Sequence, residues 1–225
     1  MTNLTNLFNT FTVFGNFLVF DEDIQPVINK VYTDCDISIK HEESQANPSG
    51  KLMIINDQRK HQNITLRPNR IDIQIPNIIP GKEQAMLKDI SDIFNSLNLI
   101  LENPDVTRIA VVQNFFVFDD NKENLARLIK TVPFVDSSLD ATEIQFRTNT
   151  PLMIGSELIN FVTNINTTFI SENKKESRNS LMFSFDVNTN HQNLDPRFSM
   201  SELQEMYESM LNIINNKLML IEETL

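Results

Sequence analysis

The sequence predicts an α+β protein in which antiparallel sheets are each packed by a long amphipathic helix, arranged as two similar halves. Two observations lead to this prediction. The hydrophobic pattern switches between the period of two residues that is typical of strands and the period of about 3.6 that is typical of helices. Several strand-like segments precede one long helical segment in residues 1–135, and again in residues 136–225. Strands followed by a helix in this way favour helices packed on antiparallel sheets, either as two domains or as one compact unit.

The N-terminal half begins with three predicted strands. Residues 10–20 (TFTVFGNFLVF) are rich in Phe and Val, and Gly15 within them predicts a bulge. Apolar runs at residues 36–41 and 51–57 predict two shorter strands. The polar segment EESQANPSG at residues 42–50 separates these two runs and is typical of a turn-forming loop.

Residues 63–76 (NITLRPNRIDIQIP) predict a β-hairpin. Apolar residues occupy even positions before Arg67 and odd positions after Arg70, so the phase changes between the two arginines. Pro68 and Asn69 suit a tight turn there, because Pro presets φ and Asn tolerates a left-handed conformation. A two-residue loop then places the apolar residues of both strands on one face. The predicted cross-strand pairs are Leu66 with Ile71 and Ile64 with Ile73. We expect both arginines to be exposed at the end of the hairpin.

A helix, a strand and a short helix follow the hairpin. Apolar residues keep helical spacing throughout residues 82–102, which makes this helix the best-defined element of the chain. Residues 106–118 (VTRIAVVQNFFVF) are apolar on both faces for most of their length, which predicts a central strand covered on both sides. Asp120 and Glu123 are spaced as an N-cap signal and predict a short helix at residues 121–131.

The C-terminal half repeats this order with three strands and a long helix. Apolar and polar residues alternate in three segments, most regularly in the last: residues 142–149, 157–170 and 180–188. The chain then ends in a predicted helix at residues 199–223, where Ser199 and Glu202 have the spacing of a capping box.

Charge and composition exclude several classes of partner. The formal net charge is −11, so phosphate backbones and anionic membrane surfaces repel the chain, and we expect no nucleic-acid and no membrane partner. This acidity is either a solubility feature or a preference for a basic partner. No apolar run approaches the roughly 18 residues that span a bilayer. Cys35 is the only cysteine, which excludes an internal disulfide and is typical of the cytoplasm, where we expect the protein to be located.

Motifs for catalysis or cofactor binding are absent from the sequence. The three histidines are isolated from one another, and no pair of cysteines or histidines has metal-ligand spacing. No glycine-rich phosphate loop and no nucleophile motif occurs. Cys35 lies between Asp34 and Asp36, whose negative charges would raise the pKa of the thiol and oppose a reactive thiolate. We therefore predict no catalytic residue, no cofactor and no metal site.

Four arginines on predicted strands are the candidate ligand-binding residues. If they line one face, their guanidinium groups would orient a small anion. They are Arg67, Arg70, Arg108 and Arg147.

The C-terminal helix carries more apolar residues near its end than a helix needs in order to cover a sheet. Met in particular suits adaptable contacts. We predict that the surplus residues meet the other half of the chain, a second subunit or a partner protein. They are Ile213, Met219 and Leu220.

Three features of the chain resemble a sporadically distributed bacterial family of uncharacterised proteins of similar length. They are the hairpin ITLRPNRIDIQIP with the helix after it, a strand that begins Thr107-Arg108-Ile109, and the second half with three strands and a terminal helix. The chain departs from the Gly, Arg and aromatic residue of the family at Ala110, Val112 and Gln113. The resemblance implies a fold rather than an activity. The scattered occurrence of the family implies mobile defence or toxin–antitoxin-type loci by association.

Two functions follow as hypotheses. The first is an intracellular, non-catalytic binding protein that acts as a homodimer or with a protein partner, as an accessory of such a locus. The second is a small-anion binder or an enzyme, with a pocket between the sheet and the C-terminal helix. A pocket that contains two or more of the four arginines favours the second hypothesis, and a filled interface between sheet and helix favours the first.

Overall fold

A computed structural model describes most of the chain. The described residues are 4–20, 22–41, 50–76, 83–102, 104–119, 121–131, 145–170 and 178–223. The strands are β1 (Thr5–Gly15), β2 (Asp36–His41), β3 (Lys51–Asp57), β4 (Gln62–Arg67), β5 (Arg70–Pro76), β6 (Val106–Phe118), β7 (Gln145–Ile154), β8 (Glu157–Ile170) and β9 (Arg178–Thr189). The helices are α1 (Ile24–Val31), α2 (Glu83–Ile100), α3 (Lys122–Thr131), the 3₁₀ turn η1 (Met200–Glu202) and α4 (Leu203–Glu222).

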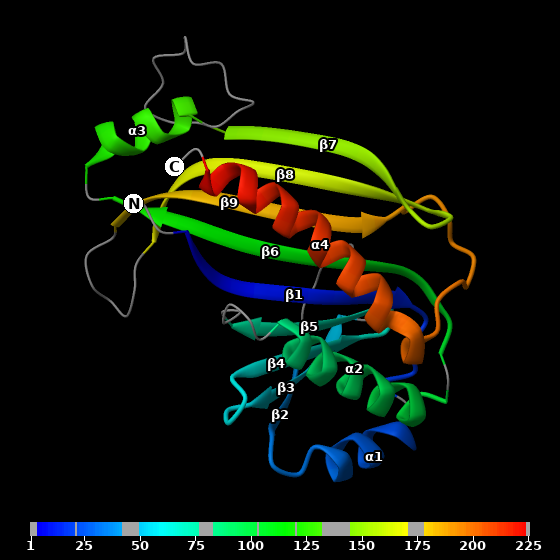
Figure 1. The fold of residues 1–225 in the computed structure, drawn as a ribbon. Helices are drawn as coiled ribbons and strands as arrows, with labels where there is room; N and C mark the ends of the chain where they lie inside the picture. Colours follow the sequence, from blue (N-terminus) through cyan, green and yellow to red (C-terminus); the bar gives the residue numbers. More distant parts are fainter. Residues whose placement is uncertain are drawn as a thin grey trace.

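The strands form one antiparallel sheet in the order β2-β3-β4-β5-β1-β6-β9-β8-β7 (Figure 1). Strand β1 lies near the middle of this sheet, because it pairs with β5 on one side and with β6 on the other. Strand β6 also pairs with β9 along most of its length. The N-terminal strand therefore joins the hairpins of the first half of the chain to the strands of the second half.

The predicted fold class, with antiparallel sheets each packed by a long helix, is wrong. Among the described residues, strand accounts for 48% and helix for 30%, and these strands belong to a single sheet. The physical reason is that both edges of β6 are used, since β1 and β9 supply backbone partners for a strand that is apolar on both faces. The sheet thus continues across the boundary predicted at residues 135 and 136, which lies outside the described residues.

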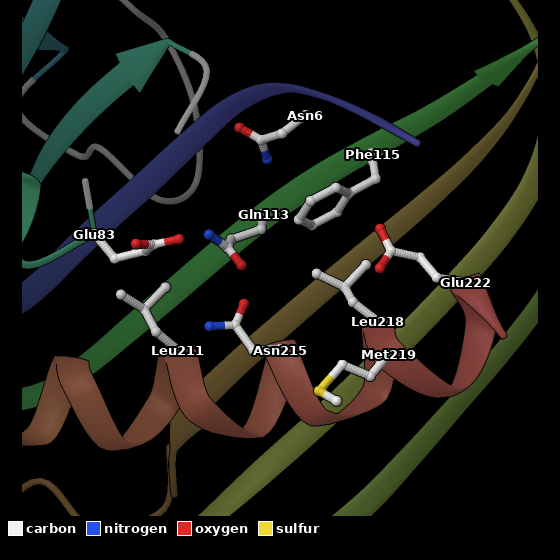
Figure 2. Close-up of a pocket in the computed structure, with 9 residues that line it drawn as sticks. All are labelled: Asn6, Glu83, Gln113, Phe115, Leu211, Asn215, Leu218, Met219 and Glu222. Carbon is white, nitrogen blue, oxygen red and sulfur yellow. The ribbon is translucent and has the colours of Figure 1, made fainter. Parts of the chain in front are cut away.

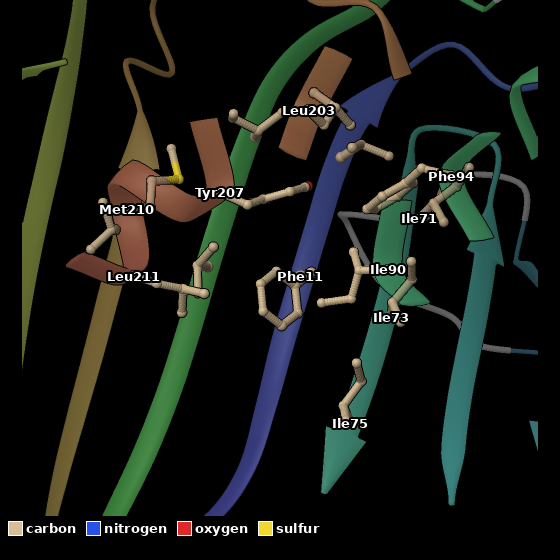
Figure 3. Packing of buried hydrophobic residues seen from close by; sticks show 14 of the residues in the cluster. Phe11, Ile71, Ile73, Ile75, Ile90, Phe94, Leu203, Tyr207, Met210 and Leu211 are labelled. Carbon is tan, nitrogen blue, oxygen red and sulfur yellow. The ribbon is translucent and has the colours of Figure 1, made fainter. Parts of the chain in front are cut away.

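Helices α2 and α4 lie on the same face of this sheet and contact each other (Figure 1). At their contact, Tyr207 of α4 stacks on Phe94 of α2 with ring centroids 5.7 Å apart, and meets Phe11 of β1 edge-on at 5.3 Å (Figure 3). The hydroxyl group of Tyr207 donates a 2.8 Å hydrogen bond to the backbone carbonyl of Thr12. This aromatic cluster therefore ties both long helices to the centre of the sheet.

The predicted hairpin is confirmed in type and in register. Arg67 lies opposite Arg70, and the two predicted apolar pairs are present. Strand β1, by contrast, occupies residues 5–15 rather than 10–20, and its pairing with β6 becomes irregular between Phe14 and Gly15. A Cβ atom at Gly15 would overlap the carbonyl oxygen of Asp105, so only glycine allows this close approach. The chain then leaves the sheet after Gly15.

Three helices and the central strand agree with the prediction, whereas α1 was not predicted. The helix predicted at residues 82–102 is α2, the strand predicted at 106–118 is β6, and the terminal helix consists of η1 and α4. Helix α3 also forms. Its first turn is capped by the side chain of Asn121, which accepts a hydrogen bond from the backbone N–H of Glu123. Asp120 and the loop at residues 42–49 lie outside the described residues. None of the described helices is long and apolar enough to cross a membrane.

Candidate functional site

The four predicted arginines lie on the face of the sheet opposite α2 and α4. Cross-strand register places Arg67 beside Arg70, Arg70 beside Phe14, and Phe14 beside Arg108. These side chains alternate with core residues such as Phe11, which face the helices. Arg147 has the same orientation, but it lies on β7, three strands away from β6, and is exposed. The structure therefore brings three of the four arginines together.

Two of these arginines share one buried carboxylate. Asp72 contacts Nη1 of Arg67 and Nε of Arg70, each at 2.8 Å, and its side chain is only 7% exposed. Thr12 Oγ1 donates a further hydrogen bond of 2.6 Å to Asp72. The side chain of Arg67 is 18% exposed, so the prediction that this arginine is exposed at the end of the hairpin is wrong. Arg67 is partly buried because Asp72 and the arginines point to the same side of the sheet, where Asp72 pairs with them.

The third of these arginines, Arg108, packs on an aromatic ring. The guanidinium carbon of Arg108 lies 4.4 Å from the ring centroid of Phe14, and that of Arg70 lies 5.3 Å from the same centroid. Burial lowers the pKa of Arg108, while the carboxylate of Asp186 opposes this change. Ion pairs thus engage Arg67 and Arg70, and a cation–π contact engages Arg108, whose buried Nε atom has no hydrogen-bond partner among the described residues. We interpret the three arginines as a structural cluster.

A pocket of about 290 Å³ lies on the other face, between the sheet and the last turns of α4 (Figure 2). Strands β1 and β6 form its floor, and the first residue of α2 lies at its side. Its lining residues are Asn6, Glu83, Gln113, Phe115, Leu211, Asn215, Leu218, Met219 and Glu222. A pocket between the sheet and the C-terminal helix therefore exists, but none of the four predicted arginines lines it.

A network of three buried amide side chains lies at the floor of the pocket, where Asn6 and Gln113 are lining residues. Asn6 and Asn9 exchange two hydrogen bonds, of 3.1 Å and 2.9 Å. They are three residues apart and would face opposite sides of a regular strand, but the pairing of β1 with β6 shifts between Asn6 and Phe8 and turns Asn6 inward. Gln113 completes the network, because its Nε2 donates to Oδ1 of Asn9 at 2.9 Å.

One atom of this network has no partner. Gln113 is 1% exposed, and its Oε1 atom accepts no hydrogen bond from the described residues. A buried polar atom without a partner costs about 1–3 kcal/mol. Such atoms are rare in folded proteins and call for an explanation. The floor of the pocket therefore contains a buried hydrogen-bond acceptor that has no partner among the described residues.

The walls of the pocket combine apolar surface with negative charge. Phe115, Leu211, Leu218 and Met219 supply the apolar part. Two carboxylates complete the lining, one at each end of the pocket: Glu83 and Glu222 (Figure 2). No Lys, Arg or His occurs among the described lining residues. The described lining thus carries negative and no positive charge, and the small-anion hypothesis stays a prediction.

The three predicted interface residues occupy two different environments. Ile213 is partly buried and packs against the hydrophobic core. Met219 and Leu220 are 59% and 54% exposed, and Met219 also lines the pocket. The surplus of apolar surface near the end of α4 is therefore real for Met219 and Leu220, and their role in an interface stays a prediction.

Cys35 and the potential metal ligands among the described residues bear on nucleophilic and metal chemistry. Burial raises the pKa of the Cys35 thiol, and the carboxylates of Asp57, Asp34 and Asp36 raise it further, whereas Arg59 lowers it. The predicted direction of this shift is confirmed. In the part of the chain that the structure describes, no three His, Cys, Asp or Glu side chains are grouped so that they could hold a metal ion.

Sequence reasoning missed Gln113, Glu83 and Glu222 as site residues. A signal for Gln113 was present, because Gln113 and Asn114 interrupt the otherwise apolar strand VTRIAVVQNFFVF. Polar residues in the middle of a buried strand need partners, which marks them for attention. No comparable signal distinguished the two glutamates from the other acidic residues.

Comparisons with known proteins add no functional information. A scan against protein-family models and a search of curated proteins find no match to the chain. The function therefore has to be argued from the pocket and its surroundings.

Proposed function

We propose that the protein is a non-catalytic binding protein whose ligand site is the pocket between the sheet and α4. The observation that carries this proposal is the unpaired Oε1 atom of Gln113 on the pocket floor. A ligand that donates a hydrogen bond to this atom would recover the free energy that its burial costs.

The composition of the pocket supports binding rather than catalysis. Small-molecule sites are mostly apolar with a few placed polar groups, and their volumes are roughly 300–1,000 Å³. The pocket has this character, and its volume of about 290 Å³ suits a small ligand. The described lining includes no Ser, Thr, Cys, Lys, Tyr or His, so carboxylates are its only titratable groups. Covalent catalysis by an activated hydroxyl, thiol or amine group therefore has no nucleophile in this described lining.

A protein partner or a second copy of the chain belongs to the same proposal. The exposure of Met219 and Leu220 supports such a contact. A role as an accessory of a mobile defence or toxin–antitoxin-type locus is supported only by the family resemblance, and a cytoplasmic location only by the single cysteine. None of the four predicted arginines lines this pocket, so the pocket does not support the small-anion alternative, which stays a prediction.

A fragment screen with a blocked variant tests the proposal. Asn215 is exposed and lines the pocket, so Asn215→Trp should fill the pocket without disturbing the core. Asn216→Trp is the matched control, because Asn216 is exposed on the same helix but is not a lining residue. Saturation-transfer NMR should detect fragments that bind the wild type and Asn216→Trp but not Asn215→Trp. If no fragment in a broad library shows this pattern, the pocket is not a ligand site.

A further inference from the structure

We infer that the pocket takes a primary amine carried on a compact apolar group. This inference rests on the proposed function and adds the chemical class of the ligand. The ammonium group would lie against Gln113 and Glu83, and the apolar group would contact Phe115, Leu218 and Met219 (Figure 2). Three steps lead from the structure to this class of ligand.

The unpaired Oε1 atom of Gln113 on the pocket floor favours a ligand that donates a hydrogen bond. The Nδ2 atom of Asn9 is used by Asn6, so Asn9 presents its oxygen to Gln113. Gln113 must therefore turn its NH₂ group toward Asn9 and its Oε1 atom away from it. The backbone carbonyl of Asn114 accepts a hydrogen bond from Nδ2 of Asn6, which sets the orientation of the asparagine pair and thus determines which end of the Gln113 amide is left for a ligand. An ionised carboxylate has no proton to offer this acceptor.

The negative charge of the lining carboxylates favours a hydrogen-bond donor that is also a cation. Glu83 and Glu222 contribute two negative charges to the lining, against no positive charge from the described lining residues. Lys217 is the only basic residue of α4 and is not one of them. The net charge of −11 for the whole chain acts in the same direction. An ammonium group donates three hydrogen bonds, so it satisfies Gln113 and still has donors for a carboxylate.

The volume of the pocket and its apolar lining residues limit which group can carry the ammonium. Four of the nine lining residues are Phe115, Leu211, Leu218 and Met219, which offer no strong hydrogen-bond partner. A hydrated metal ion would leave this surface uncompensated. A compact aryl or alkyl group would instead bury it and contribute roughly 25 cal/mol per Å² of apolar area removed from water. The exposed thioether of Met219 is flexible enough to close over such a group.

Three probes of nearly equal size separate the contributions of charge and hydrogen bonding. Benzylamine carries both a donor and a positive charge, benzyl alcohol carries a donor alone, and benzoate carries a negative charge and no donor. We expect affinity, measured by titration of the backbone amide resonances, to decrease in that order. Benzoate should produce no shift at residues that line the pocket.

Substitutions test the named contacts. Gln113→Leu removes the acceptor and should weaken benzylamine binding about tenfold or more, because a hydrogen bond to a charged group contributes about 1.5–3 kcal/mol. Glu83→Gln and Glu222→Gln should each weaken benzylamine binding while leaving benzyl alcohol unaffected. Glu223→Gln is the matched control, since it changes the net charge equally next to Glu222 but outside the lining. If Gln113→Leu does not fold, Glu83→Gln and Glu222→Gln still test the binding of benzylamine.

The outcomes separate this inference from the proposed function. Equal or tighter binding of benzoate, or unchanged benzylamine affinity in both Gln113→Leu and Glu83→Gln, would overturn the amine inference. The proposed function survives that result if other fragments still bind the wild type and are excluded by Asn215→Trp. If no probe and no fragment is excluded by Asn215→Trp, both the inference and the proposed function fail.

Discussion

Replacing each of the two tyrosines by phenylalanine tests how the helices are held to the sheet. Tyr207 is 1% exposed, and its hydroxyl group donates to the carbonyl of Thr12 in the central strand β1. The hydroxyl group of Tyr32 is also buried, but it has no hydrogen-bond partner among the described residues. Phenylalanine keeps both rings and removes only the oxygen atoms, so the two variants form a matched pair.

The expected magnitudes follow from these partners. Tyr207→Phe loses a hydrogen bond of 2.8 Å and leaves the Thr12 carbonyl with one partner fewer, which should cost about 1–2 kcal/mol. The ring contacts with Phe11 and Phe94 remain, so no cavity term is added. Tyr32→Phe removes a buried group that is already unsatisfied, so its free energy of unfolding should be unchanged or slightly higher.

The pH dependence gives a second readout of the same pair. Burial raises the pKa of Tyr207 well above its ordinary value of 10.0, and Asp72 adds to the shift. Burial also raises the pKa of Tyr32, with a smaller effect from Cys35. An unfolded tyrosine ionises near pH 10, so the unfolded chain releases protons there before the folded chain does. Wild-type stability should therefore be complete below about pH 10 and fall as the pH rises above it, and each variant should lose less over that range.

Urea unfolding followed by circular dichroism measures the free energies at neutral pH and again above pH 10. The absorbance of tyrosinate reports ionisation during the same titration. Equal destabilisation by the two substitutions, or a larger loss for Tyr32→Phe, would refute the assignment of the Tyr207 hydrogen bond as the stabilising contact.

Three further substitutions test other parts of the structure. Asp72→Asn should cost about 2 kcal/mol or more in urea unfolding, because it leaves two partly buried arginines without their carboxylate, and a neutral result would show that the cluster is solvated. Gly15→Ala should lower the free energy of unfolding by about 2–3 kcal/mol through steric overlap. Gly155→Ala should lower it by about 1 kcal/mol, because φ is +58° there but the space around the residue is open. Equal losses would contradict the close approach at Gly15. Met219→Lys with Leu220→Lys should leave the unfolding midpoint nearly unchanged and lower the mass in sedimentation if the wild type is an oligomer, whereas unfolding would show that both residues are core.

The hairpin at residues 63–76 was predictable because its information is local. The change of phase and the Pro68-Asn69 turn determine which residues face each other, and no distant segment has to be known. Helices α2 and α4 were predictable for the same reason, since their apolar spacing is a property of the segment itself. Helix α1 was missed, because it is only eight residues long and contains Pro26.

The single sheet was not predictable, because it depends on pairings across long stretches of chain. Strand β1 meets residues of β5 such as Ile73, and residues of β6 such as Val111, and an alternating strand pattern does not specify its neighbours. The pocket depends on the same contacts. Gln113 was visible as a polar residue in an apolar strand, but only the register with Asn9 and the position of α4 make its oxygen the floor of a pocket.

The methyl group of Met219 offers the most direct test that a ligand binds beneath α4. Met219 lines the pocket and is 59% exposed, while Met153 on β7 is 60% exposed and is not a lining residue, so the two methyl groups form an internal comparison. In methyl-labelled protein titrated with benzylamine, we expect the Met219 resonance, assigned by its loss in Met219→Leu, to shift and saturate while that of Met153 stays in place. Equal shifts at both methionines, or no shift at Met219, would contradict the assignment of this pocket as the binding site.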